Sequence, residues 1–173
     1  MNDVGAATSS GSQARARFDQ LHPQQEHLRL FALVDGQAFQ ALHGQSLQPG
    51  PGKRALFDGT PDAPLAPAGP WLLDLTQPLT EAEQLLARER DAPHVSWLLA
   101  ELTLDGLAQL LQLQLDAWLP DGRTALLRFY DPRVLYGLAT TLTAPQRVAF
   151  FAHIQEWHFE YEGQPMRITR RHE

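Results

Sequence analysis

Cysteine is absent from the 173-residue chain, which excludes disulfides, thiolate nucleophiles and cysteine-ligated metals together. Long apolar runs are also missing, because no window approaches the roughly 18 uninterrupted apolar residues that a bilayer span needs. The first twenty residues lack the apolar segment of a secretory signal. We therefore expect a cytoplasmic protein that has no disulfides and does not engage a membrane.

Basic residues are few and scattered. The formal net charge is −6, and the largest basic cluster consists of Arg167, Arg170 and Arg171 near the end of the chain. Nucleic-acid binders generally need a concentrated basic face to neutralise phosphates, so we expect no nucleic-acid partner. Acidic residues outnumber basic ones between residues 58 and 105, which indicates either a solvated rim or a surface that faces a basic protein.

Residues that could carry chemistry are sparse as well. No serine has the G-x-S-x-G setting of a hydrolase nucleophile, and His153 and His158 lack the spacing of a zinc-binding pair. We expect neither a metal nor another cofactor. Three carboxylates, Asp74, Glu101 and Asp105, follow predicted strands, where the sites of α/β enzymes lie. A small α/β hydrolase-like enzyme that uses these carboxylates is therefore the alternative function.

The start of the chain differs in composition from the rest. It is rich in alanine, serine and glycine and carries little apolar surface, so it has little to offset the entropy lost on ordering. We predict that residues 1–20 form a disordered leader. The remaining residues, 21–173, are of a length that favours one domain with one core.

Strand-like and helix-like segments alternate three times after this leader. Short apolar runs predict strands over residues 28–34, 71–75 and 95–99, and helical spacing predicts helices over about 37–43, 80–90 and 104–111. Thr80 and Glu83 form a capping-box pattern at the start of the second helix. The glycine- and proline-rich residues 44–70 predict a long loop. Such alternation favours a mainly parallel sheet with helices packed on it.

The rest of the chain predicts two hairpins and two further helices. Alternating residues from 113 to 119, a Pro-Asp-Gly turn and residues 124–130 predict the first hairpin. The helices are expected to begin after Asp131 and Thr143, and a closing hairpin is expected over residues 157–161 and 166–169. The predicted fold class is α/β, with a mixed, partly parallel sheet, packed helices, an antiparallel hairpin and a helical C-terminal half.

The segment Arg128-Phe-Tyr-Asp-Pro-Arg133 is similar to the signature of the type VI secretion effector chaperone family, long known only as a domain of unknown function. Similar segments occur in the family's order at Asp35 and its preceding strand, 70–73, 96–99, 120–123 and 146–151. The resemblance covers about residues 28–155. It departs from the family at 109–112, where members commonly carry a basic stretch and this chain does not.

The resemblance implies a cytoplasmic adaptor without catalysis in a Gram-negative bacterium. Such an adaptor binds a cognate effector toxin and promotes its loading onto the type VI spike protein. The signature itself also has a structural interpretation, in which Asp131 caps a helix, Pro132 begins it, and Arg128 or Arg133 pairs with Asp131. We interpret all six residues as mainly structural: Arg128, Phe129, Tyr130, Asp131, Pro132 and Arg133.

The sequence leaves two hypotheses for the surface that binds a partner. One is the closing hairpin, whose exposed edge could add a strand to the effector while Trp157, Phe159 and Tyr161 anchor it. Ordinary core packing is the alternative for these three aromatic residues. The other hypothesis is the loop from 44 to 69 together with the acidic rim that follows it.

Overall fold

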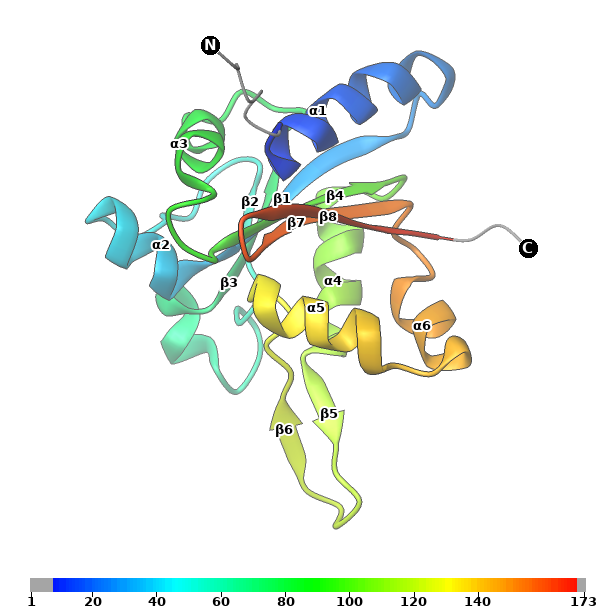
Figure 1. The fold of residues 1–173 in the computed structure, drawn as a ribbon. Helices are drawn as coiled ribbons and strands as arrows, with labels where there is room; N and C mark the ends of the chain where they lie inside the picture. Colours follow the sequence, from blue (N-terminus) through cyan, green and yellow to red (C-terminus); the bar gives the residue numbers. More distant parts are fainter. Residues whose placement is uncertain (1–7, 171–173) are drawn as a thin grey trace.

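A computed structural model describes residues 8–170, and its centre is a six-stranded antiparallel sheet (Figure 1). The strand order is β2-β3-β1-β4-β7-β8. These strands are β1 (Arg29–Asp35), β2 (Lys53–Ala55), β3 (Pro70–Asp74), β4 (Val95–Ala100), β7 (Glu156–Tyr161) and β8 (Gln164–Thr169). A separate two-stranded sheet consists of β5 (Asp116–Trp118) and β6 (Thr124–Leu126).

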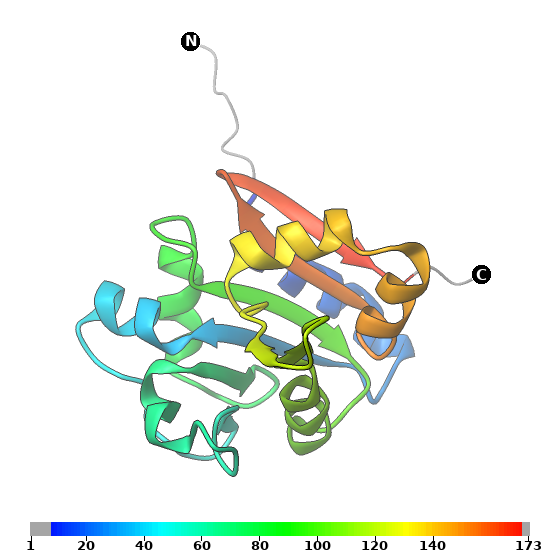
Figure 2. The ribbon, with the colours of Figure 1, turned by 90° about the horizontal axis from the view of Figure 1, so that it is seen from below.

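Helices cover both faces of the main sheet. They are α1 (Ser10–Leu21), η1 (His22–Gln24), α2 (Gly36–His43), η2 (Ala63–Ala68), α3 (Glu81–Arg88), α4 (Leu104–Gln114), α5 (Pro132–Thr141) and α6 (Ala144–Phe151). Figure 1 shows α1 and α3 on one face and α4, α5 and α6 on the other, and Figure 2 shows α5 running beside β7 and β8. No helix within residues 8–170 combines the length and apolarity needed to cross a bilayer.

The central strands are buried on both faces, as their nearly continuous apolar sequences predict. Every residue of β4 is buried. Trp97 lies on the face covered by α1, where a Cβ added to Gly11 of that helix would come within 2.6 Å of the indole. Trp157 on β7 lies on the opposite face and contacts the rings of Phe129 and Phe151 edge to face. Residues of both faces, Trp97 and Trp157 among them, belong to one cluster of buried apolar side chains, and each fully buried large side chain contributes about 1.5–3 kcal/mol.

The predicted partly parallel sheet is wrong. Strand β1 pairs antiparallel with both β3 and β4, so β3 and β4 run in the same direction but are not neighbours. The unit β3-α3-β4 is therefore a crossover that skips one strand, and β1 occupies the gap. Alternation along the sequence predicts the crossover and the direction of its two strands, but not which strand lies between them.

The expected helical C-terminal half is also wrong. Helices α5 and α6 form where they were expected, but β7 pairs with β4 and β8 pairs with β7. The closing hairpin thus extends the main sheet by two strands. The hairpin was visible in the sequence, whereas its pairing with β4 depends on residues far away along the chain.

The predicted disordered leader is corrected for the part of it that the structure describes. Residues 1–7 of the predicted leader 1–20 lie outside the described residues, and Ser10–Leu21 form helix α1. The side chain of Ser9 caps this helix by accepting a hydrogen bond from the amide of Ser12. Composition failed to predict the helix because its few apolar contacts, from Ala14, Phe18 and Leu21, are supplemented by buried polar ones.

A buried carboxylate provides the polar attachment. Glu89 accepts hydrogen bonds from the hydroxyl of Ser10 at 2.8 Å, the amide of Gly11 at 3.1 Å and the indole of Trp97 at 2.9 Å. A carboxylate at a helix N-terminus satisfies free amides and complements the helix dipole. The amide of Ser10 donates to Glu160 of β7 at 2.8 Å, which fixes the start of α1 across the sheet.

The local signals for helix starts were mostly correct. Asp131 caps α5 and Thr143 caps α6 with a complete capping box. The capping box expected at Thr80 does not form, because Thr80 already has helical backbone angles and makes no capping hydrogen bond. Helix α4 runs to Gln114, so the first hairpin is shorter than the predicted segments from 113 to 119 and 124 to 130.

Candidate functional site

The signature segment turns the chain from β6 into α5 with its aromatic residues inward. Phe129 is fully buried and contacts the rings of Phe150 and Trp157 edge to face, with ring centroids 5.6 Å and 6.0 Å apart. Tyr130 is also buried, and this burial raises the pKa of its phenol. The two rings therefore attach the corner to the core beneath the main sheet.

The polar residues of the signature begin helix α5. An oxygen of Asp131 accepts a hydrogen bond from the backbone amide of Arg133 at 2.9 Å, and Pro132 occupies the first helical position. The guanidinium of Arg133 donates to both oxygens of Asp131, at 3.0 Å and 2.7 Å. Burial opposes ionisation of this carboxyl, but the hydrogen bonds from Arg133 outweigh it and lower the pKa of Asp131.

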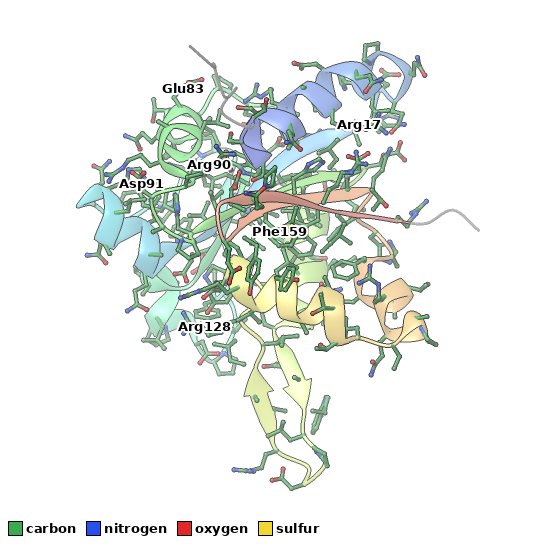
Figure 3. All side chains as sticks on the ribbon, in the orientation of Figure 1. Arg17, Glu83, Arg90, Asp91, Arg128 and Phe159 are labelled. Atoms are coloured by element: carbon green, nitrogen blue, oxygen red, sulfur yellow. The ribbon has the colours of Figure 1, made fainter. Side chains whose placement is uncertain are left out.

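Arg128 reaches a different carboxylate from the one expected. Its guanidinium lies 3.5 Å from Asp35 at the end of β1 and 5.7 Å from the centre of the Tyr130 ring. The other oxygen of Asp35 caps α2 by accepting hydrogen bonds from the amides of Gln37 and Ala38. The signature therefore joins the starts of α2 and α5 at one corner of the molecule, where Figure 3 labels Arg128.

The β5–β6 hairpin precedes this corner and projects from the body of the molecule (Figure 1). Its strands pair only with each other within the described part of the chain. Trp118 is 78% exposed and Leu126 is 42% exposed. The register pairs Trp118 with Thr124 and Asp116 with Leu126, which puts all four side chains on one face. We call the β5–β6 hairpin, residues 116–126, the arm.

The aromatic residues of the closing hairpin are packed against the rest of the protein and do not form an exposed surface for a partner. Trp157 and Phe159 are 0% and 1% exposed, and the indole of Trp157 donates to the hydroxyl of Ser96 at 2.9 Å. Tyr161 is partly buried and stacks on Tyr136 of α5 at 3.8 Å. The expectation that Trp157 and Phe159 anchor an effector is therefore corrected in favour of core packing, because β4, α5 and α6 enclose them.

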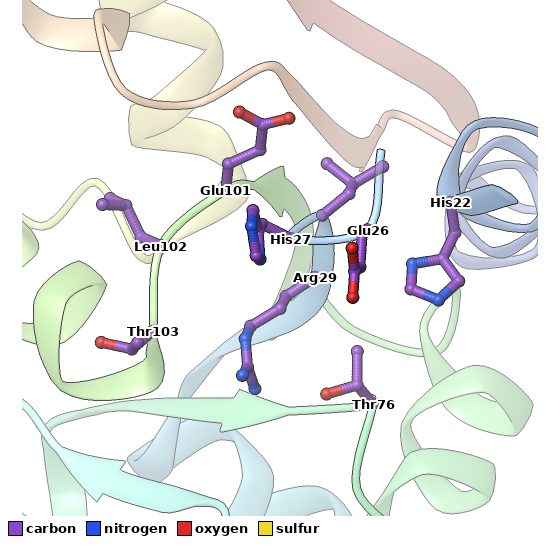
Figure 4. Close-up of a pocket in the computed structure, with 9 residues that line it drawn as sticks. His22, Glu26, His27, Arg29, Thr76, Glu101, Leu102 and Thr103 are labelled. Carbon is purple, nitrogen blue, oxygen red and sulfur yellow. The ribbon is translucent and has the colours of Figure 1, made fainter. Parts of the chain in front are cut away.

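The strand-end carboxylates do not share one pocket. Asp74 is fully buried and pairs with Arg29 at 2.7 Å, and Asp105 pairs with Arg54 at 2.7 Å. Of the three carboxylates only Glu101 lines the cavity of about 360 Å³ that Figure 4 shows, together with Arg29 and neighbouring residues. Nothing in this placement gives a nucleophile and a base within reach of each other.

The histidines likewise form no ligand set. Within residues 8–170 no three histidine, aspartate or glutamate side chains are placed to hold a metal ion. His158 is buried and its Nε2 lies 2.9 Å from Glu156. His153 is exposed on the segment after α6. His153 and His158, which the sequence analysis compared with a zinc-binding pair, thus lie in different environments.

The loop proposed as the other partner surface is anchored to the core. Residues 44–69 include strand β2 and helix η2, and Leu56 and Phe57 are buried. A Cβ added to Gly69 would come within 2.4 Å of the Phe57 ring, so this part of the loop needs a glycine for close packing. Leu65 is the large apolar side chain that η2 leaves exposed.

Sequence reasoning missed two features of this region. It predicted the first hairpin but not that the face with Trp118 and Leu126 would be the exposed one, while Ala117 and Ala125 on the other face are half-buried. It also missed the contact between Arg128 and Asp35, although Asp35 was noted where it ends the first strand. The sequence signal for the exposure of Trp118 is its position close to the charged residues of the turn.

A family model described as a domain of unknown function (DUF4123) matches residues 30–149. This range begins at β1 and ends within α6, so it includes the signature corner and the arm and leaves out α1 and the closing hairpin. Searches of curated proteins and of solved structures found no significant match.

Proposed function

The chain belongs to this domain-of-unknown-function family (DUF4123), and we propose that it is an adaptor of the type VI secretion system. In this function it binds a cognate effector toxin in the cytoplasm and promotes loading of the toxin onto the spike protein, without catalysis. The similarity of Arg128–Arg133 to the effector chaperone signature supports the proposal. The segment lies in the strand-to-helix setting that the resemblance implies.

The exposed Trp118 and Leu126 of the arm are the observation that carries a protein-binding function. Trp118 and Leu126 lie on one face of a hairpin that pairs with no other strand in the described residues. Tryptophan is among the residues that contribute most to binding at protein interfaces. An exposed apolar group on a projecting element has no role in the core, so the arm is the surface that we assign to the effector.

The signature holds the base of the arm. The amide of Leu127 donates to the carbonyl of Leu115 at 2.6 Å just below the two strands, and Phe129 is buried two residues later. Arg128 and Asp35 connect this base to α2. In this proposal the signature positions the arm, and the side chains of the arm make the contact.

The test is co-expression of the full chain with the toxin encoded beside its gene, followed by capture of the complex. We expect Trp118→Ala and Leu126→Ala each to weaken capture by about tenfold or more. Leu65→Ala is the matched control for the loss of an exposed leucine, because Leu65 belongs to η2 and not to the arm. Thermal unfolding of each variant checks that the fold is intact.

Two results would count against these proposals separately. Unchanged capture by both arm variants would overturn the assignment of the effector surface to the arm. A toxin that remains soluble and is still secreted in a strain without this protein would overturn the adaptor function. The strand-end alternative predicts instead a turnover that Asp105→Asn abolishes without loss of the fold.

A further inference from the structure

Strand β8 forms one border of the main sheet, and its outer side is unpaired within the described residues. Residues along an antiparallel strand alternate between those whose N–H and C=O bond the neighbour and those whose groups point away. The amide of Arg170 donates to the carbonyl of Gln155 in the strand-end pairing with β7. Every second residue before Arg170 bonds β7 in the same way. The residues between them, Arg167 and Thr169, therefore present their backbone N–H and C=O groups outward.

Proline occupies the third outward position. Pro165 pairs with Glu160 across the hairpin and has no amide hydrogen to offer a further strand. The part of the edge that can donate hydrogen bonds is therefore confined to Arg167 and Thr169. This restriction sets the register of any strand that pairs with β8.

A groove adjoins that part of the edge. It has a volume of about 620 Å³ and is lined by residues of α6, the segment after it and the end of β8: Ala144, Arg147, Val148, Phe151, Ala152, Thr169 and Arg170. Val148 is exposed. A strand paired with β8 would direct alternate side chains to the α6 side of the sheet, where apolar side chains could enter this groove.

The other side chains of such a strand would face a positive charge. Arg167 is 53% exposed and lies on the α1 side of the sheet, 4.0 Å from Glu156. Arg17 contacts the same carboxylate more closely, at 2.7 Å, so the charge of Arg167 is the less neutralised of the two arginines. A side chain of the added strand that faces Arg167 is favoured if it is acidic.

We propose that the outer edge of β8 and the α6 groove bind an extended segment of a partner protein in which apolar and acidic residues alternate. The segment adds a seventh strand to the sheet, places its apolar residues in the groove and its acidic residues against Arg167. A second copy of this chain is a poorer occupant, because two β8 edges supply no acidic residue opposite Arg167, and the antiparallel register centred on Arg167 places two arginines opposite each other. This surface is separate from the arm, so the proposal goes beyond the proposed function.

The test uses capped synthetic peptides of about eight residues in which valine alternates with glutamate, or with lysine as the control. Binding to the full chain is measured by fluorescence anisotropy, and the amides of Arg167 and Thr169 are followed by NMR. We expect the valine–glutamate peptide to bind at least about tenfold more tightly than the valine–lysine peptide. We also expect slower hydrogen exchange at those two amides.

Two variants separate the backbone from the charge. Thr169→Pro removes an outward amide that β7 does not use, and it should weaken the valine–glutamate peptide by about tenfold or more. Arg167→Glu should reverse the preference, so that the valine–lysine peptide binds more tightly. If Arg167→Glu also perturbs the fold, Arg167→Gln should abolish the preference. Trp118→Ala is the control that should leave peptide binding unchanged.

The proposal is overturned if neither peptide binds at millimolar concentration, if both bind equally to the unmodified chain, or if sedimentation shows that β8 pairs with a second copy instead. Any of these results leaves the toxin-capture experiment on the arm unaffected. Conversely, a failure of toxin capture leaves peptide binding at β8 unaffected.

Discussion

The two hairpins of this protein each contain a tryptophan, and the two tryptophans lie in opposite environments. The β5–β6 arm carries Trp118, which is 78% exposed, and the β7–β8 hairpin carries Trp157, which is fully buried. Both hairpins alternate apolar and polar residues. The difference arises because β7 pairs with β4 inside the main sheet, whereas the strands of the arm pair only with each other in the described residues.

The comparison shows that alternating apolar and polar residues indicate which side chains share a face of a strand. They do not indicate which other elements cover that face. On β7 both faces are covered, one by α5 and α6 and the other by α1. The polar face of β7 is consequently buried with its partners: Glu156 contacts Arg17 and His158. On the arm, Ala117 and Ala125 on one face are half-buried and the face of Trp118 is exposed, so the tryptophan is available to a partner.

The largest expected effect is a loss of folding stability on a substitution in the buried β7–β8 hairpin, which leaves the arm unchanged. Trp157→Ala should lower the free energy of unfolding by about 3–5 kcal/mol, because it leaves a cavity between Phe129 and Phe151. The matched change Trp118→Ala should alter it by less than about 0.5 kcal/mol. Urea unfolding of both variants measures the contrast, and comparable losses would show that the two tryptophans are packed alike.

A smaller effect is expected from the residue that holds α1 over the closing hairpin. Glu89→Ala should cost about 2–4 kcal/mol, because it leaves the indole of Trp97 and the N-terminal groups of α1 without their buried acceptor. Glu83→Ala is the control, since Glu83 is an exposed glutamate of helix α3, which ends at Arg88 directly before Glu89 (Figure 3). Limited proteolysis should cut α1 earlier in the Glu89 variant only. Equal protection in both variants would contradict this account of α1.

The smallest effect is a pH dependence of the buried hairpin. Burial lowers the pKa of His158 even though Glu156 opposes the shift. The unfolded chain therefore binds the proton more readily, so stability is fully present above the unfolded pKa of about 6.5 and falls as the pH drops below it.

Removing the titrating group should reduce that dependence. His158→Gln should make the fall in unfolding free energy between pH 7 and pH 5 shallower, as measured by urea unfolding across this range. Some dependence should remain, because burial also lowers the pKa of His94. His153→Gln, at an exposed position, is the matched control. An unchanged profile in the His158 variant would show that this histidine does not contribute.

Local sequence signals predicted much of the fold and the interior of the signature corner. Asp131, Pro132 and Thr143 mark helix starts through hydrogen bonds to residues next to them. The sequence predicted that Arg128 or Arg133 pairs with Asp131, and the structure shows that Arg133, which lies in the same turn, makes this pair. The pair of Arg128 with Asp35 was not predicted, since it joins segments that are distant in the sequence.

The packing of α1 beside the closing hairpin could not be predicted from the sequence, for a similar reason. Helix α1 has little apolar surface, so its composition indicated disorder. It is held by Glu89 and Glu160, carboxylates on elements far along the chain. No local pattern distinguishes such a buried carboxylate from an exposed one.

The sequence by itself determined where most of the sheet strands, the hairpin turns and the starts of α5 and α6 lie, and it identified the signature that suggests the family. These features depend on period, turn chemistry and neighbouring hydrogen bonds, all of which are local. Only the tertiary structure decided that β1 lies between β3 and β4, that Trp157 is buried while Trp118 is exposed, and that Arg167 and Thr169 form an open edge. Each of these outcomes depends on which distant segments pack together, and that choice minimises the free energy of the whole chain.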